Sequence, residues 1–141
     1  MIDIINHKNL RLAILIRKSF KNDGIEFFTS ENDSQQLGYM TREKGHEIIP
    51  HRHNIIERKV EVTQEVLFIK SGKVRVDFYD NKEEYLKSRI LNKGDIILLI
   101  DGGHGFVMLE KSEIIEVKQG PYCGEDDKVR FKLENKNINY E

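Results

Sequence analysis

The sequence predicts an all-β protein, a sandwich or barrel formed by one domain. Apolar and polar residues alternate with a period of two along much of the chain, and turn residues recur about every eight to twelve residues. No long segment has the 3.6-residue periodicity of a helix. A chain of 141 residues has the size of a single domain with one core.

In the first half of the chain, short apolar segments are bounded by turn residues such as Lys21–Gly24 and Lys44-Gly45. The predicted strands of this half are 10–17, 25–28, 37–42 and 47–53. A short helix is the competing interpretation of the first of these. Pro50 has no backbone N–H, so its strand is expected at a sheet edge or beside a bulge. Residues 54–63 show no pattern and are expected to be irregular.

The second half of the chain alternates more regularly. Its predicted strands are 65–70, 73–79, 84–91, 96–100, 106–109, 113–119 and 129–133. Tight hairpins are predicted at Ser71-Gly72 and around Lys111-Ser112. The unbroken apolar run 96–100 is typical of a strand buried on both faces. The polar residues 135–141 are expected to fray.

Charge and cysteine content exclude several classes of partner. There are 23 Lys and Arg against 24 Asp and Glu, a net charge of -1, so nothing favours nucleic acid or an anionic membrane. The single cysteine, Cys123, cannot form an intrachain disulfide, which fits a reducing compartment. The apolar run 12–16 is too short for a signal peptide or a membrane span. We therefore expect a cytoplasmic protein.

Three histidines and a glutamate are candidate metal ligands. His51 and His53 are one residue apart, so on a strand they would point to the same face. If Glu65 and His104 were brought to that face, the pocket would offer three nitrogens and one oxygen. Such a ligand set suits Fe, Mn, Ni, Cu or Zn.

These residues stand in a pattern that resembles the first motif of the cupin superfamily. That motif runs Gly, five residues, His-x-His, three or four residues, Glu, six residues, Gly. Here Gly45 precedes His51 and His53 at the family spacing, and Glu65 precedes Gly72 at the family spacing.

The two halves of this motif are joined by an insertion, residues 54–64. Glu57 lies at the family spacing from His53, but Gln64 stands where the glycine should follow it. Glu65 opens the strand that ends at the Ser71-Gly72 turn, where the family places its carboxylate. Glu65 is therefore the preferred ligand and Glu57 the alternative.

A second cupin motif is similar to residues 94–108. The family pattern is Gly, five residues, Pro-x-Gly, two residues and His, often with an Asn three residues later. Gly94 and His104 match it, although Ile100 replaces the proline, the histidine comes one residue early and Met108 stands near the place of the Asn. The resemblance covers about residues 36–119.

The resemblance implies a single-domain cupin, a double-stranded β-helix or jelly-roll barrel. Strands within 10–28 would be added to the barrel, and 135–141 would form a frayed tail. Small cupins commonly form homodimers through edge strands, and residues 11–18 are the candidate edge. The metal ligands that the resemblance implies are His51, His53, Glu65 and His104.

The resemblance also implies a function. The metal would be a divalent transition ion (Fe, Mn, Ni or Zn), and the protein would be an isomerase, epimerase, lyase or dioxygenase. Its substrate would be a small polar molecule such as a carbohydrate or a keto or hydroxy acid. Glu57, Arg58 or Tyr39 would handle protons or substrate charge. The alternative is a non-catalytic, small-ligand-binding or regulatory module.

Overall fold

The chain is all-β, as the sequence predicts. The structure is a computed structural model that describes residues 1–132, and within them the chain forms ten strands and one short 3-10 helix. The elements are β1 (Ile2–His7), β2 (Leu10–Ile16), β3 (Gly24–Phe27), β4 (Gly38–Thr41), β5 (Glu65–Ser71), β6 (Lys73–Tyr79), β7 (Tyr85–Asn92), β8 (Ile96–Leu99), β9 (Gly103–Met108), β10 (Glu113–Lys118) and η1 (Gly124–Asp127). No helix among the described residues has the length and apolar character needed to cross a bilayer.

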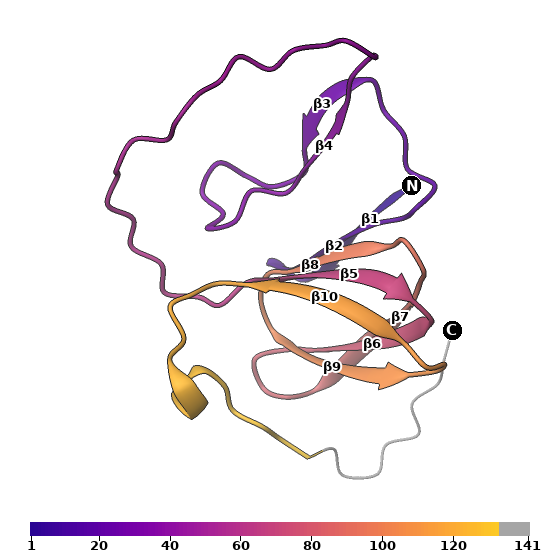
Figure 1. Cartoon of the computed structure of the whole chain (residues 1–141). Coiled ribbons are helices and arrows are strands. Elements are labelled where there is room, and N and C mark those ends of the chain that lie inside the picture. The colour runs from indigo at the N-terminus through magenta and orange to yellow at the C-terminus, as the bar shows by residue number, and fades with distance from the viewer. Residues whose placement is uncertain (133–141) are drawn as a thin grey trace.

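The strands form three antiparallel sheets (Figure 1). A five-stranded sheet has the order β1-β2-β8-β5-β10, and a three-stranded sheet has the order β7-β6-β9. β3 pairs with β4 in a separate hairpin. Within residues 1–132 none of these sheets closes on itself, so each has two edges.

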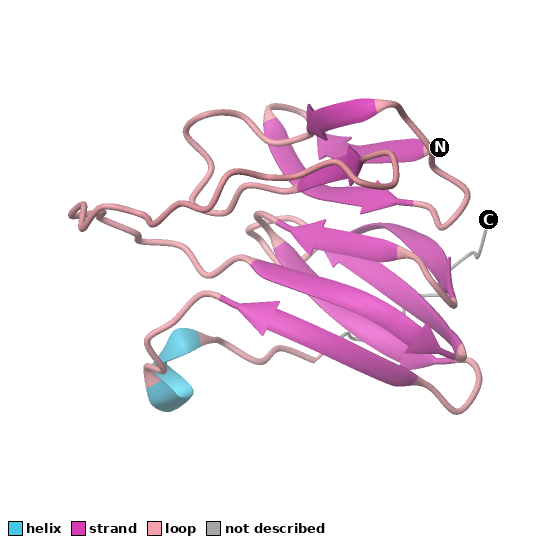
Figure 2. Ribbon diagram, turned by 45° about the horizontal axis from the view of Figure 1, so that its top comes forward, coloured by secondary structure: helices cyan, strands magenta, loops and turns pink. Residues whose placement is uncertain are grey.

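One core lies between the five-stranded and three-stranded sheets, which are stacked as layers (Figure 2). Alternate side chains of each strand point into this core because the side-chain period of a strand is two. β8 is central in its sheet, so its apolar run is buried, as predicted. The core residues are Ile5, Leu12, Ala13, Leu15, Leu67, Ile69, Val74, Val76, Phe78, Leu91, Ile97 and Leu99.

The turns after β5 and β9 carry the chain from one sheet to the other. β5 and β6 are joined by Gly72, yet β5 pairs with β8 and β10 while β6 pairs with β7 and β9. The hairpins predicted at Ser71-Gly72 and Lys111-Ser112 are therefore wrong, although their strands are in place. Gly72 has φ +81, and a Cβ on it would lie 2.3 Å from the Lys111 carbonyl oxygen. The two crossings therefore touch, and glycine allows it.

The N-terminal strands divide between two sheets. β2 lies between β1 and β8, so it is an internal strand, and the prediction that 11–18 forms a free edge is wrong. β1 forms that edge of the five-stranded sheet, and the sequence predicts no strand there because its apolar pattern is interrupted by polar residues. β3 lies apart with β4, on the side of the five-stranded sheet that faces away from the core (Figures 1 and 2). An Arg11–Asp33 ion pair ties the loop after β3 to β2.

Residues 42–64, which we call the strap, have no regular secondary structure and form a long arc away from the sheets (Figure 1). The strand predicted at 47–53 is therefore absent from this chain, because no neighbouring strand pairs with it and Pro50 cannot donate. Residues 129–132 also lack the predicted strand. The rest of that segment and the predicted tail 135–141 lie outside the described residues.

Candidate functional site

Glu65 and His104 meet across the two main sheets. Glu65 begins β5 in the five-stranded sheet, and His104 is the second residue of β9 in the three-stranded sheet. His104 lies opposite Phe78, a core residue of β6, so its ring points inward between the sheets. Nε2 of His104 is 3.2 Å from Oε2 of Glu65.

Close backbone packing fixes the position of His104. Gly102 has φ +72, and a Cβ on it would lie 2.6 Å from the Tyr79 carbonyl oxygen and 2.7 Å from Cδ2 of Leu12. A larger residue in the turn would push the start of β9 away from β6. The glycine turn that precedes His104 is thus what allows the imidazole to reach Glu65.

The Glu65 carboxylate is held in its ionised form. Its side chain is 12% exposed, and Lys118 Nζ lies 3.9 Å from its Oε1. The hydrogen bond from His104 lowers the pKa of Glu65 below its ordinary value of 4.5, against the opposing effect of burial. The positive charges of Lys118 and Lys128 act in the same direction.

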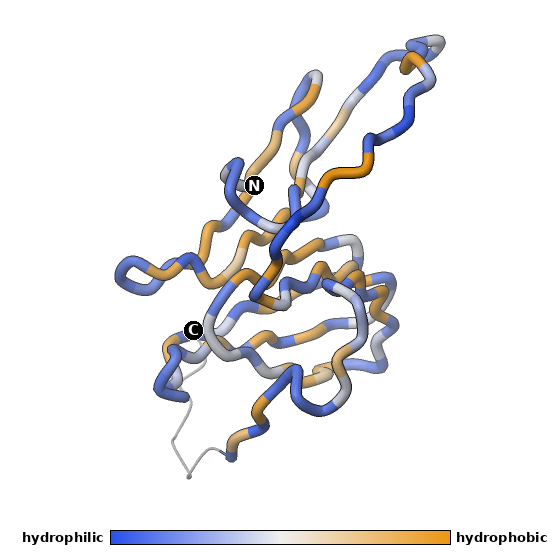
Figure 3. Tube along the Cα trace, turned by 90° about the vertical axis from the view of Figure 1, so that its left-hand side faces the viewer, coloured by the Kyte–Doolittle hydropathy of each residue, from blue (hydrophilic) through white to orange (hydrophobic). Residues whose placement is uncertain are grey.

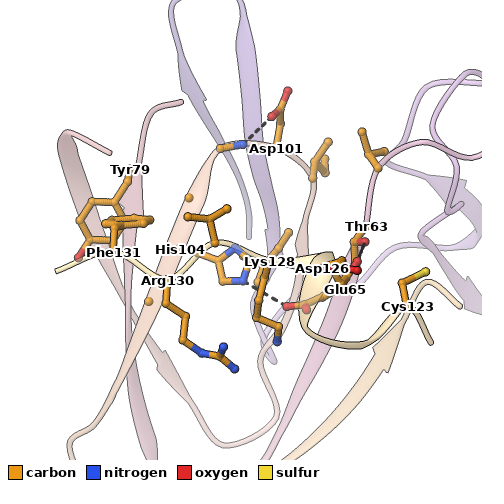
Figure 4. Close-up of a pocket in the computed structure, with 18 of the residues that line it drawn as sticks. Thr63, Glu65, Tyr79, Asp101, His104, Cys123, Asp126, Lys128, Arg130 and Phe131 are labelled. Carbon is orange, nitrogen blue, oxygen red and sulfur yellow. Dashed lines mark hydrogen bonds and ion pairs between the residues drawn. The ribbon is translucent and has the colours of Figure 1, made fainter. Parts of the chain in front are cut away.

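The Glu65–His104 pair lies in a pocket of about 1000 Å³. Its walls are the end of the strap, the start of β9 and the segment 123–131 (Figure 4). Thr63 Oγ1 donates a 2.6 Å hydrogen bond to Oδ1 of Asp127, and Phe131 packs edge-on against Tyr79 at a centroid distance of 5.2 Å. These two contacts hold the C-terminal segment over the pocket.

Sequence reasoning missed the residues that this C-terminal segment supplies. Ionisable side chains from it line the pocket, and Lys128 extends toward Glu65 and His104 in Figure 4. The available signal was a dense run of charges after Gly124 that ends in an aromatic residue. The ionisable residues that it contributes to the pocket are Cys123, Asp126, Asp127, Lys128 and Arg130.

His51 and His53 lie elsewhere, exposed on the strap. Their rings are 5.4 Å apart, and Nδ1 of His51 lies 3.0 Å from the Ile49 carbonyl oxygen. Within residues 1–132, no three His, Cys, Asp or Glu side chains are grouped closely enough to hold a metal ion. A single chain thus brings together Glu65 and His104, and its four predicted ligands do not fit a metal in this arrangement.

The other predicted site residues lie away from the pocket. Glu57 and Arg58 are exposed on the strap, where Arg58 Nη1 is 3.4 Å from the Ile56 carbonyl oxygen. Tyr39 lies in β4 and packs edge-on against Phe20 at 5.1 Å. Of the two candidate carboxylates, Glu65 lines the pocket and Glu57 does not.

The Glu65–His104 pair has the arrangement of a carboxylate-oriented imidazole. An ionised carboxylate accepts hydrogen bonds, so it holds the proton of His104 on Nε2 and leaves Nδ1 as the basic ring nitrogen. A neighbouring carboxylate also stabilises the imidazolium that forms when the ring takes a proton.

Comparisons with protein-family models, with curated proteins and with solved structures found no match.

Proposed function

We propose that this chain is a cupin-like, jelly-roll protein that binds a small polar organic molecule in the Glu65–His104 pocket and transfers a proton on it. The observation that carries the proposal is an imidazole hydrogen-bonded to a carboxylate, inside a pocket of about 1000 Å³. Isomerisation, epimerisation and elimination at a carbon beside a carbonyl all need such a proton transfer.

Each residue has a role in this proposal. Nδ1 of His104 takes the proton from the bound molecule, and Glu65 orients the ring and stabilises its positive form. Lys128, which extends toward the pair, would neutralise the negative charge that develops on the substrate oxygen (Figure 4). All three side chains line the pocket of one chain. The proposed roles need no metal ion, and within residues 1–132 the four predicted metal ligands are not brought together.

The pocket suits a carbohydrate or a keto or hydroxy acid. Its volume is at the upper end of the range of about 300–1,000 Å³ for small-molecule sites. The Tyr79–Phe131 pair gives an apolar wall for the carbon skeleton of the ligand. Lys128 and Arg130 provide partners for a carboxylate or for hydroxyl groups, although Arg130 also pairs with Glu125.

The test is proton exchange in D₂O. The full chain is incubated with panels of keto acids, hydroxy acids and ketoses, and deuterium entry beside the carbonyl or hydroxyl carbon is followed by NMR. We expect exchange on at least one compound, a loss of at least 100-fold in His104→Ala, consistent with a general base worth about 10²–10⁴, and a smaller loss in Glu65→Gln.

Matched variants outside the pocket complete the design. His7→Ala and Glu113→Gln change the same residue types at places that do not line the pocket, so they should leave exchange unchanged. Equal losses in these controls would contradict the assignment. Saturable binding of a compound without any exchange would replace the enzyme by a ligand-binding module.

A further inference from the structure

We propose that the turn after β2 and the turn between β7 and β8 form a binding site for a phosphate group, either free or carried as a phosphomonoester on a small molecule. The site is a second pocket of about 680 Å³, and its lining includes Arg17, Lys18, Asn92 and Lys93. This inference goes beyond the proposed function, because none of these residues lines the Glu65–His104 pocket.

The two pockets lie at opposite ends of the main sheets. β8 runs between them, since the turn before Ile96 lines the second pocket and Leu99, at the other end of the strand, lines the first. Figure 1 shows the same separation, with η1 on the left and the N-terminus on the right. The core residue Ile97 lies between these ends, so a small ligand in one pocket does not reach the other.

The second pocket is formed largely by turn residues. Residues 17–19 follow β2, and residues 93–95 connect β7 to β8. Figure 3 shows hydrophilic residues gathered at many turns of the molecule, where side chains reach solvent. At this pocket the hydrophilic residues come from two turns that are far apart in the sequence, and most of their charged side chains are positive.

A buried carboxylate joins the two turns. Asp95 accepts hydrogen bonds from the backbone amides of Lys18 and Asn92, and Arg17 Nη1 donates a further bond to it. Asp95 is 3% exposed, so these donors within the fold satisfy its negative charge. The carboxylate therefore holds the pocket together and leaves the lysine ammonium groups of the pocket uncompensated.

The guanidinium of Arg17 is fixed on one side only. Its Nη1 donates to the Ile90 carbonyl oxygen at 2.6 Å and to Oδ2 of Asp95 at 3.0 Å. Among the described residues, Nη2 and Nε of Arg17 have no hydrogen-bond partner, and the side chain is partly exposed. A planar guanidinium that is anchored in this way and keeps free N–H groups is preorganised to bind phosphate oxygens.

Two ammonium groups at the pocket have no counter-ion. In the part of the chain that the structure describes, no carboxylate lies within ion-pair distance of Lys18 or Lys93. The stem of Lys18 lies against the other turn, where a Cβ added to Gly94 would be 2.7 Å from Cδ of Lys18. Since Asp95 balances Arg17, the pocket keeps two unbalanced positive charges.

This arrangement of charge suits a phosphate dianion. A phosphomonoester carries a charge of about −1.5 to −2 at pH 7 and offers three acceptor oxygens. A carboxylate ligand brings one charge and would leave one ammonium group without a partner. The whole chain has a net charge of -1, so the attraction is local to this pocket and favours a small ligand over an extended polyanion such as nucleic acid.

An NMR titration tests the proposal. The full chain is labelled with ¹⁵N and prepared without an N-terminal extension, because Met1 lines the pocket. It is titrated with inorganic phosphate or with glycerol phosphate at about pH 7.5, where both are mainly dianions, in about 0.15 M NaCl to screen non-specific attraction. We expect saturable shifts of the backbone amides of Lys18, Ser19, Lys93 and Gly94. Tighter binding of inorganic phosphate would identify the free ion as the ligand, and tighter binding of glycerol phosphate would identify a phosphomonoester.

Matched lysine variants show whether the pocket itself binds the anion. Lys18→Gln or Lys93→Gln should weaken binding about three- to five-fold, and the double variant about ten-fold or more. Lys44→Gln and Lys82→Gln remove the same charge from exposed lysines that do not line the pocket, so they should leave the affinity unchanged.

Three results would overturn the proposal. One is the absence of saturable shifts with either compound. Another is an equal loss of affinity in the control variants, which would reflect only the total charge of the protein. The third is a set of shifts confined to residues 123–131, which would place the anion in the Glu65–His104 pocket instead. The titration uses neither Glu65 nor His104, so its outcome is independent of the proton-exchange assay.

Discussion

Removing the Asp95 carboxylate should destabilise the fold by about 3 kcal/mol, as expected for the loss of a buried, hydrogen-bonded charge. Asp95 is 3% exposed in the turn between β7 and β8. It accepts hydrogen bonds from Lys18 N at 2.8 Å, Asn92 N at 2.9 Å and Arg17 Nη1 at 3.0 Å. These contacts tie the end of β2 to the turn that crosses between the two main sheets.

The magnitude follows from the three lost bonds. Hydrogen bonds to a charged group are worth about 1.5–3 kcal/mol each, and breaking a buried ion pair costs about 3–5 kcal/mol. The Arg17 side chain is 26% exposed and keeps its bond to the Ile90 carbonyl, so its share is small. The two backbone amides therefore account for most of the loss in Asp95→Ala.

Urea unfolding measures this change. With a slope of about 1.5–2 kcal/mol per molar for a domain of this size, the midpoint should fall by about 1.5–2 M in Asp95→Ala. Asp95→Asn keeps an acceptor oxygen and should fall by less. Glu113→Ala removes an exposed carboxylate that also bonds its neighbours and serves as the control. A midpoint shift in Asp95→Ala no larger than in Glu113→Ala would refute the reasoning.

Three further predictions concern single contacts. His104 lowers the pKa of Glu65 below 4.5, so the ionised pair stabilises the fold above that pH. This stabilisation is lost as the pH falls through the lowered pKa. The free energy of unfolding, measured from pH 6 to pH 3, should therefore decline less steeply in Glu65→Gln than in wild type. Gly72→Ala should lower the free energy of unfolding by about 2–4 kcal/mol, because Gly72 has a positive φ and an added Cβ would clash with the Lys111 carbonyl oxygen. Gly45 also has a positive φ but has open space around it, so Gly45→Ala should lower the free energy by about 1 kcal/mol. Equal losses in the two variants would show that the clash does not contribute. Thr63→Val should speed hydrogen exchange in residues 123–131 by several-fold and lower global stability by about 1 kcal/mol, and unchanged exchange would show that its 2.6 Å hydrogen bond does not hold that segment.

The sequence was most informative where alternation was strong. The predicted strands between 65 and 119 correspond to β5 through β10. In most of them the apolar residues repeat at every second position, and most of the turns between them contain Gly, Asn or Asp. Pairing could not be read in the same way. A short turn such as Ser71-Gly72 is compatible both with a hairpin and with a crossing between two sheets. Which of the two forms depends on how the other strands of the chain pair at their edges.

Weak local patterns account for the missed elements. β1 carries Asp3, Asn6 and His7 among its apolar residues, so the sequence predicts no strand there. The segment 47–53 has a strand-like pattern, but a strand forms where a partner edge is available, and its own chain provides none among the described residues. Local propensity is a weak guide when pairing decides the outcome.

The candidate site combines what the sequence predicted with what it could not. Glu65 and His104 were identified from spacing, and the structure brings them within 3.2 Å although they come from opposite sheets. Their meeting requires the chain to cross between the sheets in the short turn after β8, which Gly102 permits with its φ of +72. His51 and His53 have the same sequence signal, but they are exposed on the strap and do not line the pocket. Spacing in the sequence selects candidate side chains, whereas the pairing of the strands decides which of these candidates come within contact distance.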